Sequence, residues 1–201
     1  KGISCFLVEK DFKGFDVGKP EDKLGIKASD TTELYFDDVH IPKENLIGNE
    51  GDGFKIALST LDGGRIGIAS QALGIAQASL DHSIKYSKER KQFNKPIASN
   101  QAIQFKLADM AMGIETARLL IYKAACAKDN KEDFSSLASM AKVYASEVAM
   151  KASTDCVHIY GGYGYIRETG VERLMRDAKI TQIYEGTSEI QRVVIARSLL
   201  K

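Results

Sequence analysis

From Phe54 to the C-terminus, apolar side chains recur at intervals of three and four residues, and this period constrains the fold more than any other feature. An α-helix places residues with that spacing on one face. The clearest stripe consists of Ile103, Leu107, Met110, Ile114, Ala117, Ile121 and Ala124. Because an apolar stripe must be buried against another element, the spacing predicts helices packed on helices.

Two further stripes extend this pattern. An earlier helix would carry Phe54, Leu58, Leu61, Arg65, Ile68, Ala72 and Ala76 on one face. A later helix would carry Leu137, Ala141, Tyr144, Val148, Ala152, Asp155 and Ile159. A short helix over about 170–178 and a last one from residue 188 complete the set. The connections are short, which favours an antiparallel four-helix bundle.

Capping residues place the helix ends. Ser99 or Asn100 is a suitable N-cap for the second long helix, and the pair Gly161-Gly162 is a suitable stop for the third. Thr187 or Ser188 can cap the last helix, where residues 188–191 read Ser-Glu-Ile-Gln and fit a capping box. The polar run 129–133 is predicted to be a loop.

Residues 1–50 follow another pattern. The runs 3–9 and 33–39 read as strands, and glycines and Pro20 punctuate the segment between them. We therefore expect a mostly α chain in which the last strands of a β-domain (residues 1–50) precede a helical domain (residues 51–201). Since the chain opens in strand-like sequence without Met, we also expect it to be a truncated piece.

Composition excludes several classes of protein. Twenty-eight basic against 27 acidic residues leave a net charge of +1, which argues against nucleic acid as a partner. The uncharged stretch 66–80 is too short and too polar to insert into a membrane. Cys5, Cys126 and Cys156 form neither a disulfide framework nor, with three scattered histidines, a metal-binding pattern. These features favour a reducing compartment and no metal site.

Residues 183–191 contain the strongest candidate for chemistry. Glu185 follows Tyr184, precedes Gly186 and stands just upstream of a helix start. A glutamate there is ordinarily a surface residue whose charge favours the helix N-terminus. The alternative is a carboxylate held on a constrained turn beside apolar surface, in position to abstract a proton. The free N–H groups of the following helix could receive a phosphate.

Three other segments have both an ordinary and a functional explanation. The glycines of residues 158–164 serve as a helix stop or let the backbone lie against a flat ligand. The basic run from Lys85 to Lys95, which contains Tyr86 and Phe93, is a solvated face or an anion site. Arg65 could reach a ligand through the space beside Gly63 and Gly64.

An ordered set of motifs across the whole chain resembles the acyl-CoA dehydrogenase family, most of all its short-chain, butyryl-CoA-type members. The motifs are Glu89-Arg-Lys-Gln-Phe93, Gln101-Ala-Ile, Leu107-Ala-Asp-Met110, Leu174-Met-Arg-Asp-Ala-Lys179 and Ile183-Tyr-Glu-Gly-Thr-Ser-Glu-Ile-Gln191. The resemblance implies that residues 1 to about 50 end the family's middle β-domain and that the rest is its C-terminal helical domain.

The resemblance also implies a role for each matching residue. Glu185 would remove the α-proton of the acyl thioester while the β-hydrogen leaves as hydride to flavin N5, and the Glu185 N–H would meet the thioester carbonyl. The substrate would be lined by Asp62, Gly63, Gly64, Arg65, Tyr184 and Gly186. FAD would be contacted by Arg90, Phe93, Gln101, His158, Ile159, Tyr160, Gly161, Gly162, Thr187, Ser188 and Glu189. The stretch 158–162 would serve a neighbouring subunit's FAD, and 187–189 the FAD of their own subunit.

Two positions depart from the family pattern. His158 stands where many relatives have Gln, so its contacts with FAD would run through the backbone, and Asn94 replaces the commoner Gly. Some relatives carry the base just before the arginine of the first helix, where this chain has Gly64. Glu185 is therefore the candidate base.

The sequence thus predicts an FAD-dependent acyl-CoA dehydrogenase of fatty acid β-oxidation that forms trans-2-enoyl-CoA. Electron-transfer flavoprotein would be its electron acceptor, and the assembly would be a homotetramer. The bacterial cytoplasm is favoured over the mitochondrial matrix. A non-catalytic helical oligomerisation fragment and an acyl-CoA oxidase remain alternatives. As given, the chain is expected to be inactive alone, because the family's β-domain covers the other face of the flavin.

Overall fold

The structure is a computed structural model, and it describes residues 2–201. It contains two compact units, which we describe separately. One ends at Leu61, and the other comprises Asp62–Lys201. The division falls inside the first long helix, α1 (Gly53–Glu89). The domain division at residue 50 stays a prediction.

The first unit holds four short strands before the helix. Strand β1 (Cys5–Phe6) pairs antiparallel with β4 (Leu46–Ile47), and β2 (Phe15–Val17) pairs antiparallel with β3 (Leu34–Phe36). The rings of Phe15 and Phe36 pack at a centroid distance of 5.1 Å. A 3₁₀ turn, η1 (Lys43–Asn45), leads into β4.

The expected strands 3–9 and 33–39 were too long, and β2 and β4 were not expected. Strand β2 lies between Gly14 (φ +88°) and Gly18, so its three residues carry too little pattern to be seen in sequence. Asp38 has φ +46° and ends the second expected run. Positive φ is incompatible with extended strand, which explains the shortening.

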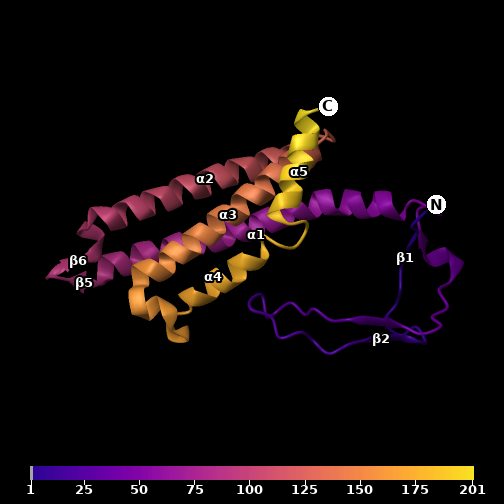
Figure 1. Cartoon of the computed structure of the whole chain (residues 1–201), viewed down its shortest axis with the longest axis horizontal. Coiled ribbons are helices and arrows are strands. Elements are labelled where there is room, and N and C mark those ends of the chain that lie inside the picture. Colours follow the sequence, from indigo (N-terminus) through magenta and orange to yellow (C-terminus); the bar gives the residue numbers. More distant parts are fainter. Residues whose placement is uncertain (1) are drawn as a thin grey trace. The chain divides into compact units, whose positions relative to one another are not determined.

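Three long antiparallel helices form the second unit, α1 together with α2 (Gln101–Asp129) and α3 (Ser135–Tyr160) (Figure 1). Two short strands, β5 (Lys91–Gln92) and β6 (Lys95–Pro96), make a hairpin between α1 and α2. Its turn residues Phe93 and Asn94 have φ +50° and +62°. Two left-handed residues are what a tight hairpin requires, but only Asn accepts that conformation readily.

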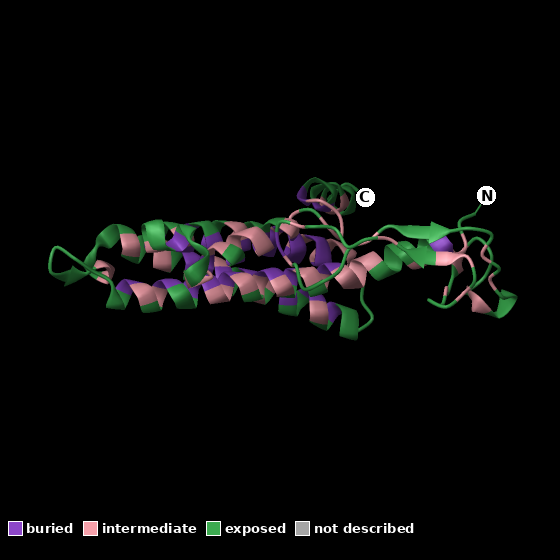
Figure 2. Cartoon of the chain, turned by 90° about the horizontal axis from the view of Figure 1, so that it is seen from below, coloured by how far each residue is buried: buried purple, intermediate pink, exposed green. Residues whose placement is uncertain are grey.

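The core of this unit is built largely from alanine. Ala72 and Ala76 of α1, Ala117 of α2, and Ala145 and Ala149 of α3 are fully buried. Larger side chains such as Met110 and Ile114 fill the spaces between them. Figure 2 shows the buried residues running along the inner sides of the helices. The predicted mostly helical fold is confirmed.

Helix α3 is the central member. Its buried residues lie on more than one side, because α2 packs on it along one face and α4 (Val171–Ile180) and α5 (Ser188–Leu199) on others. Two 3₁₀ turns, η3 (Gly161–Tyr165) and η4 (Arg167–Thr169), connect α3 to α4. The expected short helix at about 170–178 and the expected last helix from residue 188 are therefore both present, as α4 and α5.

The helix ends agree with expectation in part. Thr187, one of the two expected caps, is the N-cap of α5, and its Oγ1 accepts from Ile190 N at 3.4 Å. The alternative capping box that begins at Ser188 is wrong, because Ser188 is already the first residue of the helix. Asn100 is the N-cap residue of α2 but makes no side-chain cap bond. Gly161, at φ +61°, ends α3 as predicted.

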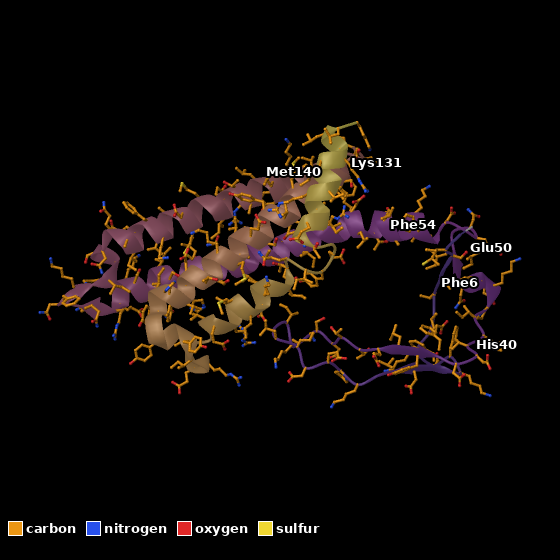
Figure 3. The ribbon with its side chains drawn as sticks, in the orientation of Figure 1. Phe6, His40, Glu50, Phe54, Lys131 and Met140 are labelled. Atoms are coloured by element: carbon orange, nitrogen blue, oxygen red, sulfur yellow. The ribbon has the colours of Figure 1, made fainter. Side chains whose placement is uncertain are left out.

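The first part of the α1 stripe lies outside the core. Phe54 is 61% exposed and Leu58 46% exposed. Figure 3 labels Phe54, which projects from the start of α1. Burial along this face begins at Arg65 and continues through Ala72 and Ala76. The periodicity thus identified the helix, but not how far along it the bundle packs.

The alanine contacts lead to a test of packing. We expect Ala117→Leu to lower the free energy of unfolding by about 1–3 kcal/mol, because the added atoms have no space between closely packed helices. The same change at Ala111, an exposed position on α2, should alter it by less than about 0.5 kcal/mol. Denaturant titration of both variants measures the difference. Equal effects at the two positions would contradict the packing.

Candidate active site

The turn between α4 and α5 carries Glu185 in a strained conformation. Glu185 has φ +55° and the next residue, Gly186, has φ +89°. Two successive left-handed residues are unusual, and the conformation is costly for a residue that has a Cβ. Strain of this kind persists only where surrounding contacts impose it. The turn is therefore held in place from outside.

The Glu185 carboxylate is directed at α1. A Cβ built on Gly64 would lie 2.9 Å from Glu185 Cδ, so only glycine leaves room for the carboxylate there. Glu185 Oε2 is buried and has no hydrogen-bond partner among residues 2–201. A buried carboxylate oxygen without a partner is expensive and points to a role other than stability.

Buried donors hold the backbone of this turn. Lys142 Nζ on α3 donates to Gly186 O at 2.7 Å. Gln191 Nε2 on α5 donates to Glu185 O at 3.0 Å and to Gly186 O at 2.9 Å. Lys142 and Gln191 are both fully buried. Three donor contacts thus converge on two consecutive carbonyls.

Arg65 lies beside this turn in a network that joins α1 to α3. Its Nη1 donates to Asp62 Oδ1 at 2.6 Å and to Ser139 Oγ at 3.3 Å. Ser135 Oγ also donates to Asp62 Oδ1, at 2.9 Å. Arg65 is only 6% exposed, and its reach to a ligand through the space beside Gly63 and Gly64 stays a prediction. The carboxylate of Glu185 faces Gly64.

Other expected substrate residues surround the same place. The Tyr184 hydroxyl hydrogen-bonds Gln71 Oε1 on α1, and burial raises the pKa of this tyrosine. Gly63 faces the Lys128 ammonium, which would lie 3.2 Å from a Cβ built there. Together with Asp62, Gly64, Arg65 and Gly186, these residues form one cluster, which we call the Glu185 cluster.

A second cluster lies in a cleft of about 520 Å³ near the β5–β6 hairpin. The rings of Tyr86 and Tyr160 stack with centroids 3.9 Å apart, and the Arg90 guanidinium lies 5.6 Å from the ring centre of Tyr163. Residues that line the cleft include Arg90, Ile159, Tyr160, Gly161 and Gly162. The structure thus brings together five of the residues expected to contact FAD.

The remaining expected cofactor residues lie at two places. Phe93, at the hairpin tip, is 97% exposed, and Gln101 and His158 are also exposed. Thr187, Ser188 and Glu189 stand at the N-terminus of α5, beside Glu185. The hairpin and α5 lie toward opposite ends of α2 and α3 (Figure 1). One copy of the helical unit therefore does not gather all expected cofactor residues into one site.

Several polar residues of the Glu185 cluster were not expected from sequence: Gln71, Ser135, Ser139, Lys142 and Gln191. Lys142 had no distinctive signal, since a lysine between Ala141 and Val143 on a helix is ordinarily exposed. Gln191 was noticed only as part of a capping box. What the sequence could not show is that both side chains point at the same turn.

Residues 51–200 match the family described as "Acyl-CoA dehydrogenase, C-terminal domain". The chain belongs to the acyl-CoA dehydrogenase family. The mouse mitochondrial short-chain specific acyl-CoA dehydrogenase is 59% identical to it over 201 residues, which are 100% of this chain and 49% of that protein. The chain thus spans about half the length of the curated relatives it matches.

Solved structures agree with this assignment. Butyryl-CoA dehydrogenase from Megasphaera elsdenii superposes with a TM-score of 0.98 at 57% identity, covering 100% of this chain and 52% of that one. A chain from a structure of the electron transferring flavoprotein of Acidaminococcus fermentans superposes with a TM-score of 0.97 at 56% identity, covering 98% and 52%.

Neither a metal site nor a membrane-spanning helix is present among the described residues. Within residues 2–201, no group of three or more His, Cys, Asp or Glu side chains is arranged to hold a metal ion. None of the helices formed by the same residues combines the length and hydropathy needed to cross a bilayer.

The buried ammonium of Lys142 gives a pH-dependent prediction. Burial, followed by the charge of Arg65, lowers the pKa of Lys142 from 10.5 to about 8, against the opposing effect of Glu185 and Glu189. Between about pH 8 and 10.5 the unfolded chain holds this proton and the folded chain does not. The free energy of unfolding contributed by Lys142 therefore rises with pH in this window. Lys142→Met should remove that rise.

Lys151→Met is the matched control on α3. Its ion pair with Asp155 raises the pKa of Lys151 from its usual 10.5, so the contribution of Lys151 is constant below pH 10.5 and is lost only at higher pH. Lys151→Met should therefore leave the rise between about pH 8 and 10.5 in place. Unfolding should be measured at half-unit intervals from pH 7 to 10.5 for the parent and both variants. An unchanged rise in the Lys142→Met variant would show that Lys142 does not titrate in this window.

Proposed function

We propose that the protein containing this chain is an FAD-dependent dehydrogenase that converts a short-chain acyl-CoA into trans-2-enoyl-CoA, with Glu185 as the base that takes the α-proton. One observation carries the assignment. A buried carboxylate oxygen has no hydrogen-bond partner in the described chain and faces the only kind of residue, a glycine, that leaves it room. A free, desolvated carboxylate is what proton abstraction from carbon requires.

The turn supplies a second group for this chemistry. No hydrogen bond from the backbone N–H of Glu185 to any of residues 2–201 is present. An N–H left free beside the base can donate to the thioester carbonyl oxygen, where negative charge develops as the α-proton leaves. Such a donor, fixed before the reaction, stabilises the enolate-like state. Base and donor belong to one residue, so their relative position is set by a single backbone conformation.

The residues near the hairpin fit a flat, phosphorylated cofactor. A Cβ built on Gly161 or Gly162 would meet no atom within 4 Å, so the backbone there is bare. Arg90 adds a cation, and Phe93 is an almost fully exposed ring. At the other end, the free N–H groups that open α5 suit an anionic group. FAD, when bound, supplies the hydride acceptor at its N5 atom.

The substrate site follows from the Glu185 cluster. Gly64 keeps the space in front of the carboxylate open, and Tyr184 and Gly186 border it. Asp62, Gly63 and Arg65 would flank the CoA part, with Arg65 anchored by Asp62 and Ser139. The close relatives are named short-chain specific or butyryl-CoA dehydrogenases, which supports a short acyl chain.

Partners are proposed on the same basis. The similarity to a chain in an electron transferring flavoprotein structure supports that class of protein as the electron acceptor. The wide separation of the two clusters supports a cofactor shared between neighbouring copies, hence a homotetramer. Relatives occur in bacteria and in mitochondria, so both the cytoplasm and the mitochondrial matrix stay open as locations.

The base assignment is tested by Glu185→Gln in the full-length, FAD-loaded protein. Glutamine keeps the size of the side chain but cannot accept the proton, so flavin bleaching by butyryl-CoA under anaerobic conditions should slow by at least ~10²–10⁴-fold. Binding of butyryl-CoA should persist. Glu132→Gln, on the exposed α2–α3 loop, is the control and should bleach normally.

Near-parental bleaching by Glu185→Gln would reject the base. A full-length protein that purifies without flavin would instead support the oligomerisation alternative. Peroxide formed in proportion to turnover would support the oxidase alternative, and its absence supports transfer to a flavoprotein.

The oligomer is tested by sedimentation. Val193 and Leu199 of α5 and the following residue, Leu200, are 41%, 73% and 86% exposed, more apolar surface than a solvated helix of this length needs. We expect the full-length protein to sediment as a tetramer, a dimer of dimers, at micromolar concentration. A stable monomer carrying one FAD per chain would contradict both the tetramer and the shared cofactor site.

A further inference from the structure

Lys142 and Gln191 are the two largest fully buried side chains among the described residues, and both are polar. Burial of a polar side chain is unfavourable unless it is matched by hydrogen bonds. Packing alone would be served better by Met or Leu of similar volume. Their donors instead contact only the carbonyls of Glu185 and Gly186. The chain therefore keeps two costly polar groups beneath one turn.

These contacts determine how the turn is oriented. The peptide group is planar, so a carbonyl held in place fixes the whole plane to which it belongs. Gln191 holds the plane that follows Glu185, and Lys142 and Gln191 together hold the plane that follows Gly186. The two planes meet at Gly186, so its φ of +89° follows from them, and the first plane also contains the Cα atom from which the Glu185 side chain departs.

Glycine at position 186 belongs to the same arrangement. A Cβ built there would lie 2.7 Å from Gln191 Nε2, inside van der Waals contact. Any side chain would thus push the amide away from both carbonyls. Backbone conformation and donor placement depend on each other at this point.

We propose that Lys142 and Gln191 are positioning residues that clamp the turn so that the Glu185 carboxylate faces Gly64. This inference rests on the proposed function, in which Glu185 is the base. In this arrangement, α3 and α5 support catalysis indirectly, because their side chains hold the backbone that carries the base. The two clamp residues come from different helices, so the aim of the base depends on how α5 docks on α3.

The positive charge of Lys142 strengthens its hydrogen bond to the Gly186 carbonyl. Burial and the charge of Arg65 lower the pKa of Lys142, Glu185 and Glu189 act against them, and the resulting pKa of about 8 leaves Lys142 mostly protonated at pH 7. An ammonium makes a stronger bond to a carbonyl than a neutral donor does. Lys142 therefore holds Gly186 O most firmly near neutral pH.

A merely structural role makes different predictions from a positioning role. If the two residues only fasten α5 to α3, their loss should weaken the fold and substrate binding together. If they aim the base, their loss should slow the chemical step while the substrate still binds. A misplacement of about 1 Å can cost ~10²-fold in rate.

The experiment compares Lys142→Met, Gln191→Met and the double variant in the full-length, FAD-loaded protein, with Lys151→Met as the control. We expect each single variant to slow anaerobic flavin reduction by butyryl-CoA by about 10²-fold. The dissociation constant for butyryl-CoA, taken from the spectral change that precedes reduction, should change by less than about threefold. The double variant should be slower than either single one by less than the product of the two effects, because both act on one turn.

Hydrogen exchange tests the clamp without reference to activity. The amides of Tyr184 and Ser188, which donate to the carbonyls of Ile180 and Gln182, should exchange at least about tenfold faster in both single variants, while those of the buried part of α2 stay unchanged. Unchanged exchange in the turn would overturn the inference whatever happens to the rate. So would parental rates of reduction, or a loss explained entirely by weaker binding. If Lys142→Met does not fold, Gln191→Met alone decides, because it removes two of the three contacts.

Failure of this inference is separable from failure of the proposed function. A Glu185→Gln variant that still reduces flavin rejects the base, even if the turn is clamped. A clamp variant with normal turn exchange and a Glu185→Gln variant without activity would keep the base and reject the clamp.

Discussion

The hydrogen bonds that join α1 to α3 are the constraint on which the candidate site of the helical unit depends. Both helices contribute fully buried alanines to one core cluster, Ala72 and Ala76 from α1 and Ala145 and Ala149 from α3. Beside this cluster, Arg65 of α1 donates to Ser139 of α3, and Ser135 of α3 donates to Asp62 of α1. The apolar packing thus brings a polar network to a defined place, next to the turn that carries Glu185.

The buried donors Lys142 and Gln191 stabilise the strained turn that carries Glu185. A left-handed glutamate costs on the order of 1–3 kcal/mol, and a buried lysine adds a desolvation cost of its own. Neither would persist alone. Lys142 stabilises the Gly186 carbonyl, and that carbonyl gives the buried ammonium a partner, so each unfavourable feature is offset by the other. The Glu185 carboxylate has no such partner at Oε2 among the described residues. The proposed base thus differs from Lys142 and Gln191, whose donors are hydrogen-bonded to the turn.

Sequence periodicity predicted the helices well, because the stripes of α2 and α3 arise from residues that pack on each other directly. The family motifs also predicted that Glu185, Gly64 and Arg65 belong to one substrate site. They could not show the direction of Arg65, since a spacing says on which side of a helix a residue lies, but not which partner it finds there. The short strands β2 and β4 were not predicted, for a different reason. Strands of two or three residues hold less than two full periods of alternation, so β2 and β4 left no pattern to detect.

Lys142 shows why the supports of a site are harder to predict than the site itself. A lysine on a helix is ordinarily exposed, and its neighbours Ala141 and Val143 do not mark it as different. Its meaning comes from a carbonyl 44 residues later in the chain, which reaches it only because α4 and the following turn fold back along α3. Reactive groups carry their chemistry in the residue type, whereas positioning groups acquire theirs from the contacts that the fold creates. A candidate base can therefore be recognised in the sequence, while the residues proposed to position it become visible only in the structure.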